Sequence, residues 1–164
     1  MDEQKITPTK KGIIISRNLD VPKRTLNYST WLNEGNNEEV IKFIPLEHSY
    51  SSSYIGSVGF FEISQYPEWV SRLKVNEGLL QNHFFPFGGF PEETVPELVG
   101  KGLAKKIEFE IAKDLSTKFA SNTPIVIGAT SDSHEAYCRR IGIVPFEVMT
   151  LKEYINILSR PQKD

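Results

Sequence analysis

The most regular pattern along the chain is a stripe of apolar residues spaced four positions apart between residues 102 and 119. The stripe consists of Leu103, Ile107, Ile111, Leu115 and Phe119, with Ala104 and Ala112 beside it. Charged side chains are assigned to the opposite, solvent-facing side: Glu108, Lys113, Asp114 and Lys118. This spacing predicts an amphipathic helix over 102–119 whose apolar side packs on a sheet.

Short runs rich in β-branched and aromatic residues predict strands in the rest of the chain. The runs are 12–16, 39–46, 54–64, 125–129 and 143–151, and 84–95 is a further β-prone stretch. We expect 39–46 and 54–64 to pair as a hairpin, and the apolar run 125–129 to be a buried parallel strand. With the 102–119 helix between them, the β-prone stretch and 125–129 form a βαβ unit.

Shorter helices are predicted at four other places: 24–32, 67–80, 134–141 and 153–158. The third of these has capping residues at both ends, Ser131 or Asp132 at its start and Gly142 at its end. The expected fold is therefore α/β (α+β), a single domain over 1–164 with a mixed, mostly antiparallel sheet flanked by helices. The ends of the chain, 1–11 and 160–164, are expected to be flexible.

Composition places the chain among globular proteins and removes several function classes. Its 164 residues are 39% hydrophobic and 24% charged, which is enough for one packed core. The net charge of −2 argues against a general nucleic-acid binder. A single cysteine, Cys138, excludes an internal disulfide, and no apolar run is long enough to cross a membrane. We therefore expect a cytoplasmic protein.

The segment before the long helix carries the main chemical signal. Gly100 and Gly102 stand one residue apart where a strand becomes a helix, so main-chain N–H groups can turn outward without an obstructing Cβ. A helix N-terminus also offers unpaired N–H donors and partial positive charge to an anion. Lys101, Lys105 and Lys106 crowd the same turn, where cations are unfavourable unless an anion binds between them.

The stretch Pro96–Ala104, with the sequence PELVGKGLA, resembles the acyl-coenzyme A loop of the GNAT acetyltransferase superfamily, which commonly reads PEYRGKGIG. Two residues, Gly102 and Ala104, match the small positions of the family's Q/R-x-x-G-x-G/A signature, and Val99 replaces its opening Gln or Arg. In that family the main-chain amides of the loop hold the pyrophosphate of the cofactor. The resemblance implies a site for acetyl-CoA or another acyl-CoA formed by Val95, Val99, Gly100, Lys101, Gly102, Leu103, Ala104, Lys105 and Ser131.

A second segment that resembles the family follows the 125–129 strand. GNAT chains often run N-x-x-A-x-x-x-Y-x-x-x-G-F there, which sets Ser131 at the Asn position and Cys138 at the Tyr position. That tyrosine is commonly the acid that protonates the leaving thiolate of coenzyme A. The neighbouring Tyr137 is turned by about 100° around the helix, and both residues are kept as acid candidates. From its type alone, Cys138 can also be a buried apolar residue or a nucleophile.

Acyl transfer to an amine also needs a base that keeps the amine neutral. Glu93 lies just before the loop and is the predicted base, with Glu92, Glu62 and His83 as further candidates that can equally be structural. The phenylalanines of 84–90 can line an acyl pocket or belong to the core. Because His and Cys do not cluster at metal-ligand spacing, no metal is expected.

These observations favour an acyl-CoA-dependent N-acyltransferase that acts on a small-molecule or peptide amine. A GNAT-like domain that binds CoA without catalysis is the alternative, and an acyl-homoserine-lactone-synthase-like enzyme, using acyl carrier protein and S-adenosylmethionine, ranks below both. The segment 65–83 is an insertion relative to the family pattern, either a lid or a packing helix. Neither nucleic acid nor a membrane is expected as a partner. The sequence does not decide whether the chain forms a homodimer.

Overall fold

One sheet runs through the part of the chain that the computed structural model describes, which is residues 12–20, 24–32, 39–47, 53–84, 102–129 and 131–161. Its seven strands lie in the order β3-β1-β2-β4-β5-β6-β7. The strands are β1 (Gly12–Asp20), β2 (Thr25–Leu32), β3 (Glu39–Pro45), β4 (Ser53–Glu62), β5 (Leu79–Phe84), β6 (Pro124–Ile127) and β7 (Val148–Thr150). All neighbours pair antiparallel except β5 and β6, which are parallel. The expected mixed, mostly antiparallel sheet is confirmed.

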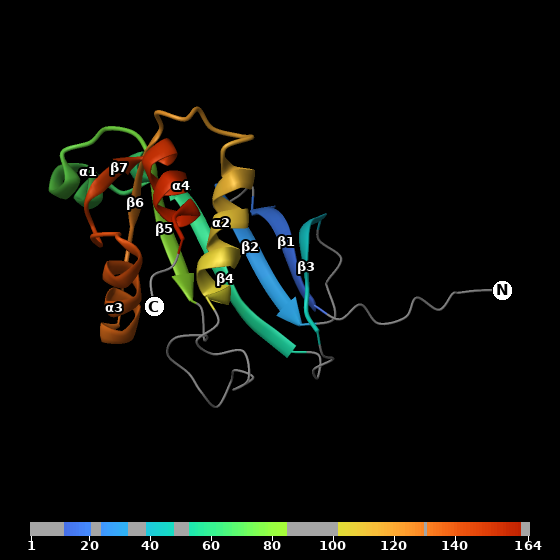
Figure 1. Ribbon diagram of the computed structural model, residues 1–164. Coiled ribbons are helices and arrows are strands. Elements are labelled where there is room, and N and C mark those ends of the chain that lie inside the picture. Colours follow the sequence, from blue (N-terminus) through green and yellow to red (C-terminus); the bar gives the residue numbers. More distant parts are fainter. Residues whose placement is uncertain are drawn as a thin grey trace.

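The two faces of this sheet are covered by different helices. Within the described residues these are α1 (Pro67–Leu73), α2 (Leu103–Leu115), α3 (Asp132–Ile141) and α4 (Leu151–Ser159), and a 3-10 turn (Ile63–Gln65) precedes α1. Buried residues of α2, α3 and α4 share one large cluster with the sheet, the main core. Trp69 and Val70 of α1 pack instead against Leu80 and Val126 on the other face. Figure 1 shows α2 running along the sheet with α4 beside it.

The prediction of a helix over 24–32 is wrong, because this segment is the strand β2. Its exposure alternates along the strand, with Leu26, Tyr28, Thr30 and Leu32 buried and the residues between them half-buried. Period-two alternation is the pattern of a strand with one face on the core. The β-branched and aromatic residues of the segment also favour a strand.

The predicted hairpin between 39–46 and 54–64 is also wrong, although both segments are strands. The strand β3 pairs with β1, Gly12 lying opposite Pro45, whereas β4 pairs with β2. The strands β1 and β2 therefore lie between β3 and β4 in the sheet. Strand pairing depends on contacts between distant parts of the chain, and the unrecognised strand β2 supplies the partner that β4 requires.

Several other segments are shorter than predicted. The helix predicted over 102–119 ends at Leu115 and the strand predicted over 125–129 ends at Ile127, and two differences are larger. The helix predicted over 67–80 stops at Leu73, because Lys74 takes a left-handed conformation with φ 59° and Gly78 has φ 141° before β5 begins. The strand predicted over 143–151 is reduced to β7, since Phe146 has φ 65° and Leu151 already starts α4. A left-handed residue breaks both helix and strand geometry.

A βαβ unit is present as β5–α2–β6, because β5 and β6 pair in parallel and α2 lies between them in the chain. Its first strand is Leu79–Phe84, whereas residues 85–95 of the predicted first strand lie outside the described residues. The caps of α3 are confirmed as well, since the Ser131 hydroxyl accepts the His134 N–H at 3.2 Å and Gly142 closes the helix with φ 102°. Arg160, predicted to be flexible, is the C-cap of α4. Among the helices described, none has the length and apolarity needed to span a membrane.

Candidate functional site

The edge of the sheet where β5 and β6 end is the place where the predicted cofactor residues meet the fold. Parallel pairing of β5 and β6 spans three residue pairs and stops at Gln81 and Ile127. Since β5 pairs with β4 as far as Phe84, the last three residues of β5 have no β6 partner in the described chain. A helix that connects two parallel strands starts at the carboxyl end of the first, so α2 begins at this edge.

The start of α2 has the conformation that a glycine permits. Gly102 is the N-cap and has φ 72°, a left-handed value that costs a residue with a Cβ about 1 kcal/mol or more. Because glycine has no side chain, it cannot cap the N–H groups of the first turn itself. Leu103 and Ala104 are half-buried and pack against the main core, which fixes the direction of that turn.

Several predicted residues lie outside the described part of the chain: Glu92, Glu93, Val95, Val99, Gly100 and Lys101. The same holds for the phenylalanine cluster from 85 onward. Of His83 the structure describes the main chain, which pairs with Val58 in β4. The roles given to these residues therefore stay predictions.

Lys105 and Ser131 both have partners within the protein. The Lys105 side chain is buried, and its ammonium donates to the Arg160 main-chain oxygen at 2.5 Å, which ties the end of α4 to the first turns of α2. This contact explains a lysine near the helix N-terminus without any bound anion. Ser131 is exposed at the carboxyl end of β6, where its hydroxyl caps α3, so Ser131 lies at the predicted edge and Lys105 is turned toward α4.

A buried polar cluster lies behind this edge, and the sequence did not reveal it. Glu108 of α2 is 1% exposed and accepts hydrogen bonds from the hydroxyls of Tyr154 and, at 3.2 Å, of Tyr137. The amide of Gln81 donates to the Tyr154 hydroxyl at 3.1 Å and to Glu108 at 3.5 Å. The amide oxygen of Gln81 has no hydrogen-bond partner among the described residues. Helices α2, α3 and α4 and strand β5 thus meet in one polar cluster.

The hydrogen bonds of Glu108 come from hydroxyls and an amide, and no described residue places a cation on it. Burial raises the pKa of Glu108, and the hydrogen bonds from Tyr154, Tyr137 and Gln81 offset this only in part. Burial and then the nearby Glu108 raise the pKa of both tyrosines well above their ordinary value. The cluster therefore favours neutral side chains that share protons through hydrogen bonds.

This cluster bears directly on the two acid candidates. Cys138 is 1% exposed in the main core, and burial, followed by the nearby Glu108, raises the pKa of its thiol to about 12. Its position matches the reading of a buried apolar residue. The hydroxyl of Tyr137 is held on Glu108. Both groups would be weak proton donors to a thiolate whose own pKa is near 8.5.

Because the Cys138 thiol is buried and protonated, it should react slowly with thiol reagents. At pH 8 in native buffer we expect labelling by a disulfide reagent at least about tenfold slower than in denaturant, where the thiol titrates near 8.5. Absorbance at the released chromophore measures both rates on the same sample. Labelling as fast as that of the unfolded chain would show that the thiol is accessible and reactive.

Glu62, the alternative base, lies at the other end of the sheet. It pairs with Leu79 at the amino end of β5, and its carboxylate is bound by Arg24 at 2.6 Å. A base must reach the reacting amine within hydrogen-bond distance, directly or through one water. Glu62 is therefore not part of the carboxyl edge of β5 and β6.

The sequence did carry one signal for Glu108. Ala104, Glu108 and Ala112 are spaced four apart along the border of the apolar stripe, and the structure buries Glu108 and Ala112 and half-buries Ala104. The assignment of Glu108 and Asp114 to the solvent-facing side is wrong, because Asp114 is 15% exposed and bound to Arg17. Glutamate is rarely buried without a partner, and the partners of Glu108 come from remote elements.

Comparisons with protein-family models, with curated protein sequences and with solved structures find no match to this chain.

Proposed function

We propose that the chain is an acyl-CoA-dependent N-acyltransferase with a GNAT-like fold. The observation that carries the proposal is the β5–α2–β6 unit, in which a helix with an N-cap glycine at φ 72° begins at the carboxyl edge of two parallel strands. Ligands of open α/β sheets bind at this kind of edge. The PELVGKGLA segment that leads into α2 is the part of the sequence that resembles the acyl-CoA loop.

The chain's own groups suit a diphosphate and a polar ligand at this edge. The first-turn N–H groups of α2 receive no side-chain cap from Gly102, and such donors bind phosphate well. The amide oxygen of Gln81, which no described residue hydrogen-bonds, lies at the last β5–β6 residue pair. A buried amide oxygen without a partner costs about 1–3 kcal/mol, so a ligand or water that donates to it would be favoured. The base in this proposal is Glu93.

The proposed reaction lacks a strong side-chain acid. A positioned acid typically contributes about 10²–10⁴-fold to a rate, and neither Cys138 nor Tyr137 is poised to give its proton. A thiolate with a pKa near 8.5 can leave as the anion at neutral pH and take its proton from water. The proposed enzyme would therefore turn over slowly rather than not at all.

The lack of a strong side-chain acid favours a second candidate function, a CoA-binding domain without catalysis. Binding and turnover separate the two. Isothermal titration with acetyl-CoA and octanoyl-CoA measures binding, and release of free CoA thiol with a panel of small amines and peptides measures transfer. Binding with thiol release supports the acyltransferase, and binding without it supports the binding domain. If neither acyl-CoA binds, both candidates are rejected.

Replacing Gly102 with valine should weaken acetyl-CoA binding by at least about tenfold, because a branched side chain blocks the main-chain N–H groups and strains φ 72°. The dissociation constant from titration is the measurement. Gly142→Val is the matched control, since Gly142 is also left-handed, with φ 102°, but caps the end of α3. Equal loss of affinity in both variants, or none in Gly102→Val, would contradict a main-chain cradle at this turn.

A further inference from the structure

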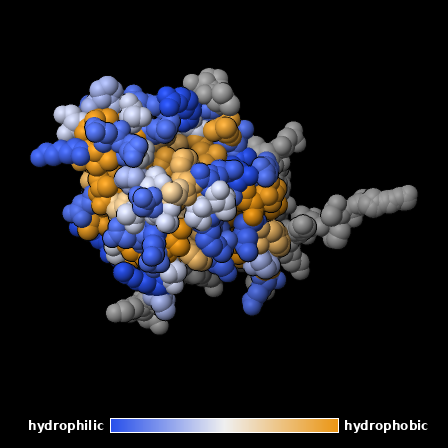
Figure 2. All heavy atoms as spheres, turned by 90° about the horizontal axis from the view of Figure 1, so that it is seen from above, coloured by the Kyte–Doolittle hydropathy of each residue, from blue (hydrophilic) through white to orange (hydrophobic). Residues whose placement is uncertain are grey.

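A cavity of about 610 Å³ opens at the opposite end of α2 from the proposed cofactor edge. Its apolar lining comes from Leu19, Leu26, Phe60, Leu79 and Phe119. Leu26, Phe60 and Leu79 are almost fully buried, whereas Leu19 is exposed. Its volume lies within the range of about 300–1,000 Å³ common for small-molecule sites. Figure 2 views the molecule from this end, where apolar surface shows between polar side chains.

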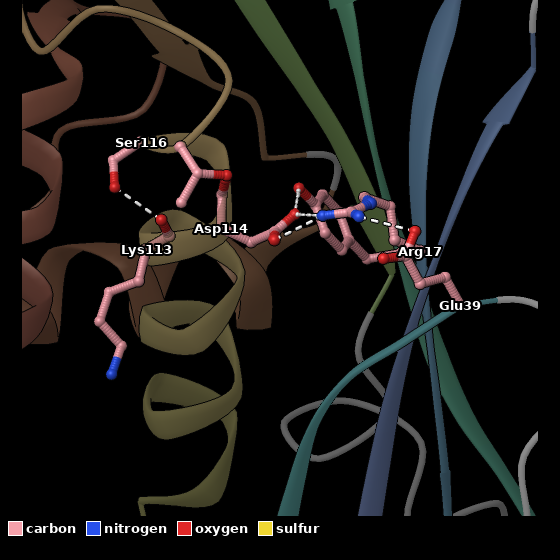
Figure 3. Close-up of polar contacts among 7 residues, drawn as sticks. Arg17, Glu39, Lys113, Asp114 and Ser116 are labelled. Carbon is pink, nitrogen blue, oxygen red and sulfur yellow. Dashed lines mark hydrogen bonds and ion pairs between the residues drawn. The ribbon is translucent and has the colours of Figure 1, made fainter.

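Among the described residues that line the cavity, Arg17 is the one charged side chain that is largely buried, and Asp114 binds it from behind. Its Nη1 donates to both carboxylate oxygens of Asp114, at 2.5 and 2.6 Å, and the Tyr28 hydroxyl donates to the same carboxylate at 2.7 Å. The side chains of Arg17 and Asp114 are 14% and 15% exposed. Figure 3 shows Arg17 lying between Asp114 of α2 and Glu39 of the sheet. The guanidinium is thus a rigid part of the wall.

The other edge of Arg17 carries a carboxylate that is easily displaced. Nη2 of Arg17 binds Glu39 at 2.7 Å, and the Glu39 side chain is 68% exposed. At the mouth of the cavity Arg24 is bound in the same way by Glu62, and both side chains are about half exposed. The Arg24–Glu62 pair, with both side chains exposed, contributes only about 0–1 kcal/mol. Glu39 shows that a carboxylate fits this edge of the Arg17 guanidinium, and its own exposed side chain can turn into solvent when another carboxylate replaces it.

The lining offers an anion more partners than it offers a cation. Its cations are Arg17, Arg24 and Lys118, and its carboxylates are Glu39 and Glu62. Asp114, behind the wall, also binds Arg17, so the charges around the cavity balance. Both lining carboxylates already bind an arginine, whereas no ion pair is found for Lys118 among the described residues. An apolar ligand with one carboxylate would bury its body on the leucines and phenylalanines and bring its charge to the guanidinium.

We propose that this cavity binds an apolar monocarboxylate, such as a medium-chain fatty acid, whose carboxylate replaces Glu39 on Arg17. The site is separate from the proposed cofactor edge. The helix α2 from Leu103 to Leu115 spans about 18 Å, because each of its twelve steps rises about 1.5 Å, and the cavity lies beyond its last turn, at Lys118 and Phe119. A molecule in the cavity cannot reach a thioester bound at the start of α2. The cavity is thus a second ligand site, and it does not depend on the acyltransferase proposal.

The test uses octanoate, with octanol and octylamine as matched neutral and cationic probes, on the full chain. Titration calorimetry should give saturable one-to-one binding of octanoate, with octanol and octylamine at least tenfold weaker. Methyl NMR shifts should centre on Leu26 and Leu79. No saturable octanoate binding at millimolar concentration would overturn the proposal, and so would equal or tighter binding of octanol or octylamine.

Glu39→Gln provides the sharpest variant, because it removes the competing carboxylate while keeping the shape of the side chain. We expect it to tighten octanoate binding three- to tenfold, a direction that general damage to the cavity would not produce. Glu135→Gln is the matched control, since it removes a carboxylate from another exposed arginine pair, Glu135–Arg139 on α3. Weaker or unchanged binding in Glu39→Gln, or the same gain in the control, would overturn the proposed exchange on Arg17.

Discussion

Asp114→Ala is expected to lower the free energy of unfolding by about 3 kcal/mol, the scale found when one partner of a largely buried ion pair is removed. The variant leaves the guanidinium of Arg17 with only the exposed Glu39, and it leaves the Tyr28 hydroxyl without its acceptor. Tyr28 is fully buried, so it cannot turn to bulk water instead. Two groups from β1 and β2 thus lose the residue that joins them to α2.

Urea denaturation at pH 7 measures this loss, and the melting temperature should fall by roughly 6–12 °C at the usual 2–4 °C per kcal/mol for this chain length. Glu135→Ala is the control, because the exposed Glu135–Arg139 pair on α3 should be worth only about 0.3–0.5 kcal/mol. A loss below 1 kcal/mol for Asp114→Ala would mean that the Arg17–Asp114–Tyr28 contacts do not hold α2 on the sheet.

The pKa directions agree with this account. The hydrogen bond to Asp114 and then that to Glu39 raise the pKa of Arg17 above its ordinary value, so the guanidinium stays charged at any pH of interest. Burial, followed by the hydrogen bond to Asp114, raises the pKa of Tyr28. The ionised carboxylate of Asp114 therefore faces one permanent cation and one neutral hydroxyl, which is a stabilising set of partners.

The parts of the fold that local sequence determines were predictable. The apolar stripe of α2 and the caps Ser131 and Gly142 depend on residues within a few positions of one another. The β5–α2–β6 unit follows from a helix between two strands, because parallel neighbours need such a crossover. These are the elements on which the functional proposal stands.

The errors share a non-local cause. The segment 24–32 is a strand because Leu26 and Tyr28 pack in the main core between β1 and β4, and its few apolar positions were equally compatible with a short helix. The pairing of β3 with β1 could not be predicted either, because without β2 the segment 54–64 had no strand to pair with except 39–46. Tertiary packing outweighs the intrinsic helix or strand propensity of a short segment.

The site shows the same division between local and distant information. The glycine at the start of α2 could be predicted, because a left-handed N-cap needs only its own residue type. The buried cluster could not, since Glu108 meets Tyr137 and Tyr154 from positions 29 and 46 residues further along. From its residue type alone, a carboxyl side chain at the border of an apolar stripe is predicted to face solvent. The hydroxyls that allow Glu108 to be buried come from distant parts of the chain, which only the fold brings together.

The two acidic residues that α2 turns to the protein interior illustrate opposite solutions. Asp114 meets a guanidinium, whereas Glu108 meets only hydroxyls and an amide. Desolvation disfavours a charge in both places, and within the described part of the chain only Asp114 has a cation to compensate. The first carboxyl should therefore stabilise the fold as an anion, and the second as a neutral acid.

Glu108→Gln should make the fold progressively more stable than the wild type as pH rises above about 4.5. Because the pKa of Glu108 is raised in the folded chain, the folded state keeps a proton that the unfolded chain has lost above its ordinary value of 4.5. Wild-type stability consequently falls with rising pH until the folded pKa is passed. Glutamine has the same shape and no charge, so the variant lacks this fall.

Urea denaturation of both proteins at pH 4, 5.5, 7 and 8.5 measures the difference, which should grow by about 1.4 kcal/mol for each unit by which the folded pKa exceeds the unfolded one. Near pH 4 the variant should be as stable as the wild type or slightly less stable. The hydroxyls and the amide around residue 108 donate to a carboxyl group, and the glutamine amide replaces one of its oxygens with a donor. The exposed Glu135→Gln serves as the control for loss of one charge. Parallel stability curves for the wild type and Glu108→Gln would show that Glu108 ionises without cost, and a buried cation or water would then have to be sought beside it.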